Sequence, residues 1–329
     1  MAVLVTGGAG YIGSHTVLEL IKLGEKVVVI DNLQNGHKEA LFNEAKFFEG
    51  DLRDSVFLDR VFAEKIDTVV HFAADSLVGE SMEDPLKYFD NNVGGAISLL
   101  KAMSKHKVKK MVFSSTAAVY GEPDLMPIPE TLQTNPTNPY GETKLVIEKM
   151  LQWSEWAYGI KHVVLRYFNV AGADLDGKLG EDHVPETHLI PIVLQVALGK
   201  REKIMIFGDD YDTADGSCIR DYIHVTDLAD AHILAIKRLR EGGTSSVYNL
   251  GNGNGFSVKE VIEISREITG KKIPAEVAPR REGDPASLVA SSGKAADELG
   301  WKPKYTALNT MINSAWNWFQ KHPGGYAGK

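Results

Sequence analysis

A glycine-rich segment near the start of the chain constrains the fold more than any other feature of the sequence. Gly7, Gly10 and Gly13 lie in TGGAGYIG, between the apolar run Ala2–Thr6 and the stretch Ile12–Leu23, whose apolar residues have helical spacing. Glycines in such a strand–turn–helix let the backbone approach a pyrophosphate, and the free N–H groups of the helix N-terminus favour its charge. The pattern predicts a dinucleotide-binding βαβ unit.

An acidic residue follows the second predicted strand, Lys26–Ile30. Asp31 stands eighteen positions after Gly13, where a carboxylate can accept hydrogen bonds from the ribose hydroxyls of a dinucleotide. Neither of the next two residues is an arginine that could bind a 2′-phosphate, so the sequence favours NAD over NADP. Asp51, in EGDLRD, would suit the adenine edge, and the alternative is an ordinary acidic residue of a turn.

Strand-like and helix-like segments alternate through the first half of the chain. Further predicted strands are Asp67–Phe72, Lys110–Ser114 and His162–Tyr167, and further predicted helices are Ser55–Glu64, Asn92–Ser104 and Tyr140–Ala157. Such alternation indicates parallel strands with helices on both faces of the sheet. We therefore expect an α/β fold whose residues 1–172 form a Rossmann-type, doubly wound parallel sheet and bind NAD.

The pattern changes after about Gly172. Residues 173–185 are rich in Asp, Gly and Glu and predict a loop. Predicted helices at Thr187–Leu198 and Val258–Thr269 and predicted strands at Lys203–Phe207 and Val247–Leu250 follow. The apolar stretch Tyr222–Leu239 is expected to return to the large sheet, so that about 218–240 completes it. The remainder of 173–329 is predicted to form a smaller C-terminal α/β lobe that binds the substrate.

Composition limits the ligands and the compartment. Lys plus Arg is 36 and Asp plus Glu is 44, a formal charge of −8, which argues against a nucleic-acid partner. The single cysteine, Cys218, has no assigned chemistry; it excludes an intrachain disulfide and a multi-cysteine zinc site and favours a reducing compartment. No apolar run approaches the ~18 residues of a membrane span, and the first residues lack a signal-peptide pattern. We expect a cytoplasmic protein without a membrane partner or a metal.

Tyr140 and Lys144 lie four residues apart in NPYGETK, which places both on one face of a helix that Pro139 would begin. An unperturbed tyrosine has a pKa of ~10. It therefore stays protonated at neutral pH and cannot accept a further proton as a base. A nearby ammonium and a cationic nicotinamide would both favour the phenolate. The spacing alone is common by chance, but downstream of a dinucleotide motif it predicts a general base that accepts a hydroxyl proton.

An ordered series of motifs extends over essentially the whole chain. They are TGGAGYIGSH, DNLQNG, EGDLRD, HFAADSLVGES, DNNVGG, FSSTAAVYG, NPYGETK, LRYFNVAGA, IFGDDYDTADGSCIRDYIHVTDLADAH, YNLGNG, APRREGDP and HPGGY. In these motifs the chain resembles the extended short-chain dehydrogenase/reductase family, and within it the UDP-glucose 4-epimerases. The resemblance implies bound NAD and reversible inversion at C4 of UDP-glucose and UDP-galactose through a 4-keto intermediate, as in galactose metabolism. It also implies a homodimer formed through helices Asn92–Ser104 and Tyr140–Ala157.

The resemblance assigns roles to individual residues. The catalytic residues would be Tyr140, Lys144 and Thr116, whose hydroxyl would bind the sugar O4. The residues expected to bind NAD are Gly7, Gly10, Tyr11, Ile12, Gly13, Asp31, Asn32, Asn35, Gly36, Asp51, Leu52, Phe72, Ala73, Ala74, Asn91, Lys144 and Phe168. Those expected to bind the UDP-sugar are Thr116, Tyr140, Asn169, His188, Leu189, Met205, Ile206, Phe207, Arg220, Arg281 and Asp284. Without the resemblance, Arg220 could equally form an ion pair with Asp221.

Several positions depart from relatives or leave alternatives open. Ser76 stands where some relatives have a lysine that contacts the cofactor, and His188 stands where some have an asparagine. Leu288 occupies a position whose size influences whether an N-acetyl group fits, so activity on UDP-N-acetylhexosamines stays open. The alternative functions are a UDP-glucuronate 4-epimerase and a non-catalytic NAD-sensing regulator of the same fold. Ala117 and Ala118 cannot transfer a proton, which argues against dehydratases and decarboxylases.

Overall fold

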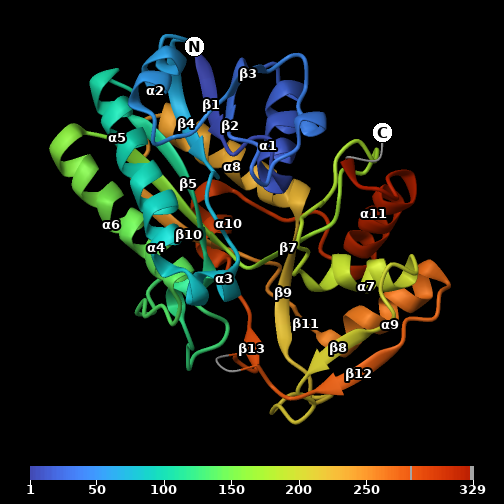
Figure 1. Ribbon diagram of the computed structural model, residues 1–329. Helices are drawn as coiled ribbons and strands as arrows, with labels where there is room; N and C mark the ends of the chain where they lie inside the picture. Colours follow the sequence, from blue (N-terminus) through green and yellow to red (C-terminus); the bar gives the residue numbers. More distant parts are fainter. Residues whose placement is uncertain (282–283, 327–329) are drawn as a thin grey trace.

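A large parallel sheet forms the centre of the protein, described by a computed structural model for residues 1–281 and 284–326 (Figure 1). Its seven strands, in spatial order, are β10 (Ser246–Leu250), β6 (Lys161–Tyr167), β5 (Lys110–Thr116), β4 (Ile66–His71), β1 (Ala2–Thr6), β2 (Val27–Asp31) and β3 (Lys46–Glu49). Every neighbouring pair is parallel. The strand order runs in opposite directions on the two sides of β1, which confirms the predicted doubly wound Rossmann-type sheet.

Helices cover both faces of this sheet. One face carries α2 (Ser55–Phe62), α5 (Gly95–Lys105) and α6 (Pro139–Tyr158), and the other carries α1 (Tyr11–Lys22), α8 (Val225–Arg240) and α10 (Gly293–Leu299). Successive residues of a strand point to opposite faces. Leu4 accordingly belongs to an apolar cluster with Leu99 of α5, whereas Val5 belongs to a cluster with Val17 of α1 and Leu228 of α8. Burial on both faces explains why these strands read as continuous apolar runs.

Short helices surround the carboxyl edge of the sheet. They are η1 (Lys38–Ala40), α3 (Val78–Glu83), α4 (Pro85–Tyr88), the π-helical turn η2 (Phe89–Gly94) and η3 (Ala117–Tyr120). The helix predicted over Asn92–Ser104 is therefore the end of a longer helical run. Within the π turn, the Asn92 amide donates to the carbonyl of Asp75 at 3.0 Å and to Thr143 Oγ1 at 3.1 Å. Asn92 thereby ties the loop after β4 to α6.

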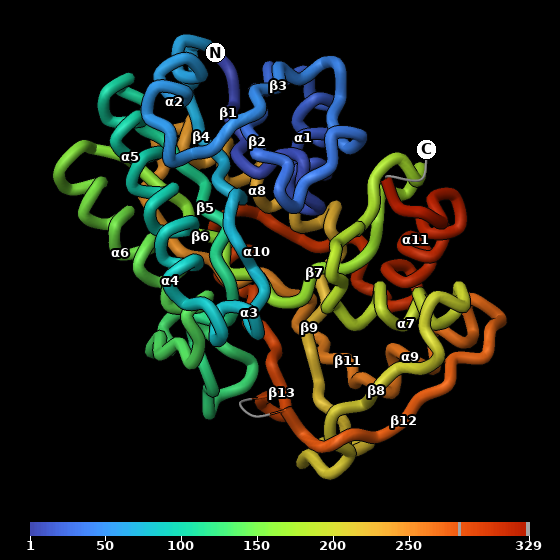
Figure 2. Tube along the Cα trace, in the orientation of Figure 1, coloured from blue at the N-terminus to red at the C-terminus, as the bar shows by residue number. Residues whose placement is uncertain are grey.

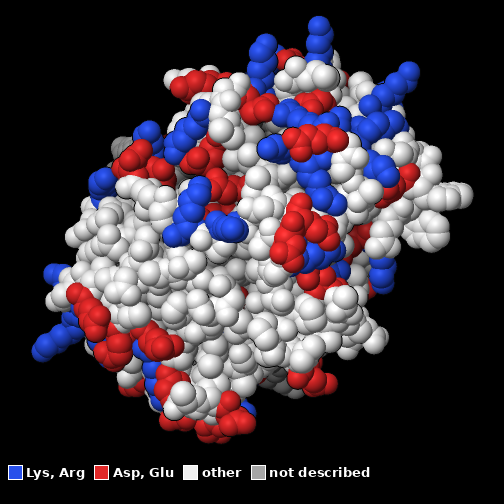
Figure 3. Space-filling view, turned by 180° about the vertical axis from the view of Figure 1, so that it is seen from behind, with Lys and Arg blue, Asp and Glu red and all other residues white. Residues whose placement is uncertain are grey.

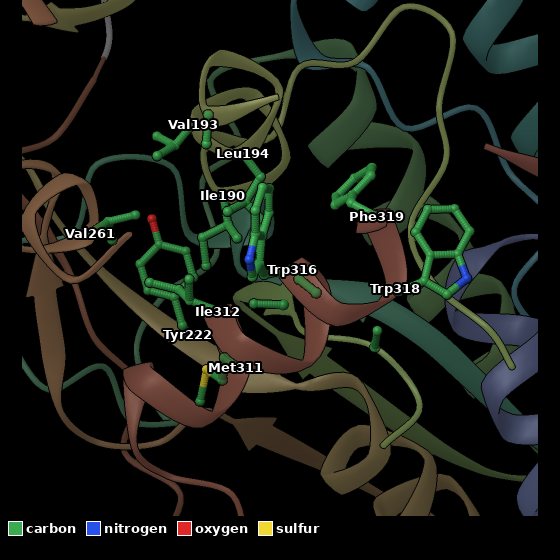
Figure 4. Close-up of a cluster of buried hydrophobic side chains, with 14 of the residues drawn as sticks. Ile190, Val193, Leu194, Tyr222, Val261, Met311, Ile312, Trp316, Trp318 and Phe319 are labelled. Carbon is green, nitrogen blue, oxygen red and sulfur yellow. The ribbon is translucent and has the colours of Figure 1, made fainter. Parts of the chain in front are cut away.

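A smaller group of elements lies beside the large sheet. Its strands are β7 (Asn169–Ala171), β9 (Ile219–His224), β11 (Gly255–Ser257) and β13 (Ser287–Leu288), with a second pair formed by β8 (Ile204–Phe207) and β12 (Ala275–Ala278). Its helices are α7 (Leu189–Ala197), α9 (Val258–Thr269) and α11 (Leu308–Lys321). Trp316 and Ile312 of α11 are buried with Leu194 of α7, Val261 of α9 and Tyr222 of β9 (Figure 4). These side chains give the smaller lobe its own apolar core.

The chain passes between the large sheet and the smaller lobe more often than we predicted from the sequence. The stretch Tyr222–Leu239 divides into the end of β9 and α8, and α8 packs on the large sheet as expected (Figure 2). The predicted strand Val247–Leu250, which we placed in the smaller lobe, is part of β10 and pairs with β6. The sequence did not predict β3, an edge strand whose exposed Lys46 and Glu49 flank only two apolar residues. A strand this short and half-exposed gives too little apolar periodicity to detect.

Within the described residues, no helix has both the length and the apolar character needed to cross a membrane. Basic and acidic side chains are intermixed on the face opposite to that of Figure 1, where a broad uncharged area lies between them (Figure 3).

Candidate active site

The glycine-rich segment forms a tight turn that only glycines can fill. Gly7 follows β1 with φ +72°, and a Cβ there would lie 2.6 Å from the backbone nitrogen of Ala73. A Cβ at Gly13 would lie 2.1 Å from the carbonyl oxygen of Gly7. Gly10 is the N-cap of α1, whose first turn has neither a side-chain cap nor an acidic residue. The first N–H groups of α1 are therefore left for an anionic ligand.

Asp31 lies at the carboxyl end of β2, beside this turn. Its carboxylate accepts hydrogen bonds from the backbone N–H groups of Ala9 at 3.0 Å and Leu33 at 2.9 Å. Burial raises the pKa of Asp31 above its ordinary value, against the effect of these two hydrogen bonds. A Cβ on Gly36 would lie 2.9 Å from both Ala9 Cβ and Asp31 Oδ1, so the loop after β2 packs directly on the glycine turn.

The remaining residues predicted to bind NAD lie along the same edge of the sheet. Asn32, Asn35 and Gly36 follow β2, Asp51 and Leu52 follow β3, Phe72, Ala73 and Ala74 follow β4, Phe168 follows β6, Asn91 lies in η2, and Tyr11 and Ile12 begin α1. The carboxyl ends of parallel strands meet at one edge, which explains how distant segments converge.

Asp51 forms an ion pair with Arg53, whose Nη2 lies 2.7 Å from Asp51 Oδ2, and this contact lowers the pKa of Asp51. Its adenine contact stays a prediction. Ser76, where some relatives have a lysine, is exposed.

Tyr140 and Lys144 project from the first turns of α6. Asn138 caps this helix by accepting from the N–H of Gly141 at 2.8 Å, and Pro139 occupies its first position as predicted. Both functional side chains are buried, and Lys144 Nζ donates to the carbonyl of Ser114 at 2.9 Å while lying 5.9 Å from the centre of the Tyr140 ring. Thr116, the last residue of β5, lies beside the Tyr140 hydroxyl and lowers its pKa. The structure thus brings the three predicted catalytic residues together.

The Lys144 ammonium does not lower the pKa of Tyr140 as we predicted. Burial raises the pKa of Tyr140 to about 12, despite the opposing effect of Thr116. Burial also lowers the pKa of Lys144 to about 8, against the opposing charge of Glu148. The ammonium of Lys144 contacts a carbonyl and not the phenol oxygen, so it does not offset the burial of Tyr140. A tyrosinate here therefore requires a further positive charge, such as that of a cationic ligand.

A buried ion pair lies directly behind Lys144, and the sequence analysis missed it. Glu148, one turn further along α6, accepts from Ser115 Oγ at 2.6 Å and from Arg166 Nε at 3.0 Å. Arg166 Nη1 also donates to the Tyr120 hydroxyl at 2.8 Å. Tyr140, Lys144 and Glu148 recur at intervals of four, and this spacing was the available signal.

Three residues predicted to bind UDP converge in the smaller lobe. Arg220 Nη2 lies 3.3 Å from Asp284 Oδ1, and Arg281 Nε donates to Asp284 Oδ2 at 2.9 Å. The Arg281 guanidinium lies 4.7 Å from the centre of the Phe207 ring. The alternative pair of Arg220 with Asp221 does not form, because Asp221 accepts from three backbone N–H groups instead. Met205 and Ile206 precede Phe207 in β8, and Asn169 begins β7.

The short strand β13 connects this cluster to the catalytic helix. Leu288 pairs with Arg220 in the register of β13 and β9. Its side chain packs in an apolar cluster with Phe168, Val119 of η3 and Leu145 of α6. The position that we linked to sugar size therefore lies between the two arginines and the Tyr140–Lys144 pair.

His188 has a different environment from the one predicted. It caps α7, which begins at Leu189, and its Nδ1 lies 2.9 Å from Glu181 Oε1 and 3.1 Å from Glu186 Oε1. The ring is therefore engaged with the two glutamates through Nδ1, and its role in place of an amide donor stays a prediction. The sequence analysis missed both glutamates.

Comparisons with known proteins agree with this geometry. The model of the NAD dependent epimerase/dehydratase family matches residues 3–251. A UDP-glucose 4-epimerase of Halalkalibacterium halodurans is 65% identical over 328 residues, which cover 99% of this chain and 98% of that protein. The chain therefore belongs to the NAD dependent epimerase/dehydratase family.

Solved structures of this family support the same conclusion. A crystal structure of a UDP-glucose 4-epimerase matches with a TM-score of 0.98 and 62% identity, covering 99% of both chains. The Bifidobacterium longum UDP-glucose 4-epimerase, in complex with NAD+ and UDP, matches with a TM-score of 0.93 and 44% identity, covering 99% of this chain and 100% of that one. The glycine turn fits NAD, the cofactor of the family, because it presents bare backbone and a free helix N-terminus where a side chain would block the approach.

Replacing Gly13 with alanine should abolish tight binding of NAD. The new Cβ would lie 2.1 Å from the carbonyl oxygen of Gly7, so the turn must open and α1 must move away from β1. Gly293→Ala, at a helical glycine with nothing within 4 Å, is the matched control. Isothermal titration with NAD checks both variants, and an unchanged affinity in Gly13→Ala would contradict the assigned cofactor cradle.

Proposed function

We propose that the chain catalyses the reversible inversion at C4 of UDP-glucose and UDP-galactose with bound NAD. The observation that carries this proposal is the buried group of Tyr140, Lys144 and Thr116 between the glycine turn and the Arg220–Arg281 cluster. NAD, when bound, supplies reversible oxidation and reduction at C4, so no external oxidant is needed.

The protein residues hold the sugar and move one proton. Tyr140 accepts the proton of the O4 hydroxyl and later returns it, and Thr116 donates a hydrogen bond that keeps O4 against the phenol oxygen. Lys144 is fixed by the Ser114 carbonyl, where it can bind the nicotinamide ribose through its remaining N–H bonds. A positive charge arriving beside Tyr140 lowers the pKa of its hydroxyl and so couples cofactor binding to formation of the base.

Recognition falls mainly on UDP. The planar guanidinium groups of Arg220 and Arg281 suit paired phosphate oxygens, and both are positioned by Asp284. The Asp284 carboxylate would then accept from the ribose hydroxyls. Firm binding of UDP with few sugar contacts lets the 4-keto sugar turn over in the site, so that its other face is reduced.

The two ligands bind to different parts of the chain in this proposal. Residues 1–172, completed by about 218–240, form the NAD-binding part, and 173–329 supply the smaller UDP-sugar lobe, apart from β10 and α10, which join the large sheet. We place the protein in the cytoplasm, in keeping with its single buried cysteine, Cys218.

Product analysis tests the proposal. The purified chain is incubated separately with UDP-galactose, UDP-N-acetylgalactosamine and UDP-glucuronate, and the products are resolved by chromatography and proton NMR. We expect UDP-glucose from UDP-galactose without added oxidant. Failure to convert UDP-galactose would overturn the proposal, and conversion of UDP-glucuronate alone would establish the alternative epimerase. The N-acetylated substrate reports how much space Leu288 leaves.

We further propose a homodimer formed through α5 and α6. On these helices Leu100, Leu145 and Leu151 are buried in the monomer. Trp153 and Trp156 of α6 are instead 71% and 84% exposed, and their rings lie 6.4 Å apart in an edge-to-face arrangement. Two adjacent exposed tryptophans are unusual on a monomer surface and are enriched in interfaces.

Replacing Trp153 and Trp156 with serine should convert the dimer to a monomer. When the helices separate, the apolar surface of both rings is exposed to water, which is unfavourable. Serine has little apolar surface and so removes this contribution to dimer stability. Sedimentation equilibrium measures the mass, with Val277→Ser, an exposed apolar residue of β12, as the control. A wild-type mass of one chain, or an unchanged mass in the double variant, would contradict the proposed interface.

A further inference from the structure

Four side chains of ligand type meet in the loop segment that precedes α7. Glu181, His183, Glu186 and His188 each offer one donor atom, and these atoms all lie within 4.8 Å of one another. The residues follow the pattern E-x-H-x-x-E-x-H in the sequence. Our expectation of no metal rested on the scarcity of cysteine and overlooked this pattern.

The two carboxylates are buried and have no Lys or Arg partner within residues 1–281 and 284–326. The side chains of Glu181 and Glu186 are only 5% and 3% exposed. Glu186 Oε1 accepts from the backbone N–H groups of Thr187 and His188, both at 2.8 Å. Among the described residues, the charged groups that face the two carboxylates are the imidazoles of His183 and His188. Buried carboxylates need close compensation, because burial strongly disfavours an unpaired charge. The negative charges of the two carboxylates therefore require either a cation bound in the cluster or two protonated histidines.

The position of His183 favours the cation. Its Nδ1 is buried and makes no hydrogen bond among the described residues, although it lies 3.4 Å from Glu181 Oε1 and 3.5 Å from Glu186 Oε2. An ion pair that stabilised the loop by direct hydrogen bonds would close these distances. Its distance from each carboxylate instead resembles the separation between two ligands of one metal ion.

The nitrogen–oxygen separations are in the range of ligands that surround one metal ion. Bonds of ~2.0–2.1 Å from zinc to nitrogen or oxygen place adjacent tetrahedral ligands about 3.3–3.4 Å apart. His183 Nδ1 and His188 Nδ1 lie 3.4 and 2.9 Å from Glu181 Oε1. His183 Nδ1 lies 3.5 Å from Glu186 Oε2, and His188 Nδ1 lies 3.1 Å from Glu186 Oε1. We infer that Glu181, His183, Glu186 and His188 form a binding site for one divalent transition-metal ion of the zinc type.

The donor set decides the class of ion. Two imidazole nitrogens with two carboxylate oxygens suit Zn²⁺ and its first-row neighbours, whereas Ca²⁺ and Mg²⁺ prefer six or more oxygen ligands or waters. Two carboxylates also neutralise one divalent ion. No ligand position is left open by four protein donors, which is the arrangement of a structural site.

The site would fasten the nucleotide turn to the smaller lobe. The Tyr11 ring, at the start of α1, lies edge-on to His183 with 6.3 Å between ring centres, and the Tyr11 hydroxyl donates to the carbonyl of Gly172 at 2.6 Å. His15 donates to the Tyr11 carbonyl at 2.7 Å and accepts from the N–H of Asp174 at 3.1 Å. A bound ion would complete these contacts by fixing the segment that leads into α7.

Metal binding to the full-length, untagged chain tests the inference. The protein is stripped with a chelator, loaded with Zn²⁺ or Co²⁺, passed through a desalting column and analysed by mass spectrometry of the metals. We expect one Zn²⁺ per chain, an intense visible spectrum typical of tetrahedral Co²⁺, and a rise in melting temperature with Zn²⁺ but not with Mg²⁺. Wild-type protein that retains no Zn²⁺ would overturn the inference.

Two ligand variants and one matched control locate the ion. His183→Gln and Glu186→Gln should each weaken Zn²⁺ binding by about 100-fold or more, since even indirect partners of metal ligands contribute ~10–100-fold. His106→Gln, which breaks the pair of a half-buried histidine with Asp59, should bind Zn²⁺ as wild type does. Unchanged binding in a folded ligand variant, or equal loss in the control, would assign the metal elsewhere. Having two ligand variants keeps the test valid if one fails to fold.

Discussion

Tyr140→Phe should lower kcat for UDP-galactose by about 10²–10⁴-fold, the usual contribution of a positioned general base. The change removes only the oxygen that accepts the O4 proton, while the ring still fills the buried space beside Lys144. UDP should bind with unchanged affinity, because its predicted contacts lie on Arg220, Arg281 and Asp284 in the smaller lobe. Steady-state kinetics and titration with UDP separate these two effects.

A second tyrosine provides the control. Tyr248, in β10, is fully buried, and its hydroxyl donates to Glu298 at 2.7 Å, away from the catalytic group. Tyr248→Phe should therefore leave kcat unchanged. A Tyr140→Phe enzyme with near wild-type turnover would remove Tyr140 as the base, and equal losses in both variants would indicate a general effect on folding.

Glu148→Gln should destabilise the protein by about 3–5 kcal/mol, the usual cost of removing one partner from a buried ion pair. Glutamine keeps the volume of the side chain but leaves the Arg166 guanidinium buried without a counter-charge; both side chains of this pair are under 9% exposed. The free energy of unfolding, measured by urea titration, reports the loss. The same change removes a charge that supports the ammonium of Lys144.

Glu155→Gln, on the same helix, is the matched control for this prediction. Glu155 pairs at the surface with Lys161, whose side chain is 49% exposed, so its loss should cost no more than about 1 kcal/mol. Equal effects of the two substitutions would show that the buried pair contributes no more than a surface pair.

The sequence predicted the large sheet well because its strands are buried on both faces. Val3, Leu4 and Val5 are all fully buried, although alternate side chains enter different clusters, and such runs stand out without any periodic pattern. The position of β10 could not be predicted from its own residues. Its partner β6 lies about eighty residues earlier, and only packing of the complete fold determines that pairing.

The candidate site likewise has features that follow from local sequence and features that depend on the complete fold. Local rules were enough for the glycine turn and for the Tyr140–Lys144 pair, since both depend on spacing within one segment. Glu148 was missed because its meaning depends on Arg166, a residue on a neighbouring strand. The raised pKa of Tyr140 was also missed, because burial is a property of the folded chain and spacing alone suggests only the neighbouring charge.

The fate of the hydrogen at C4 tests the central claim most directly. UDP-galactose carrying deuterium at C4 is converted in ordinary water, and the product is examined by proton NMR and mass spectrometry. If bound NAD takes this hydrogen and the same site returns it while Tyr140 moves only the O4 proton, the UDP-glucose formed keeps its deuterium at C4. A product that carries hydrogen from the solvent at C4 would contradict the account.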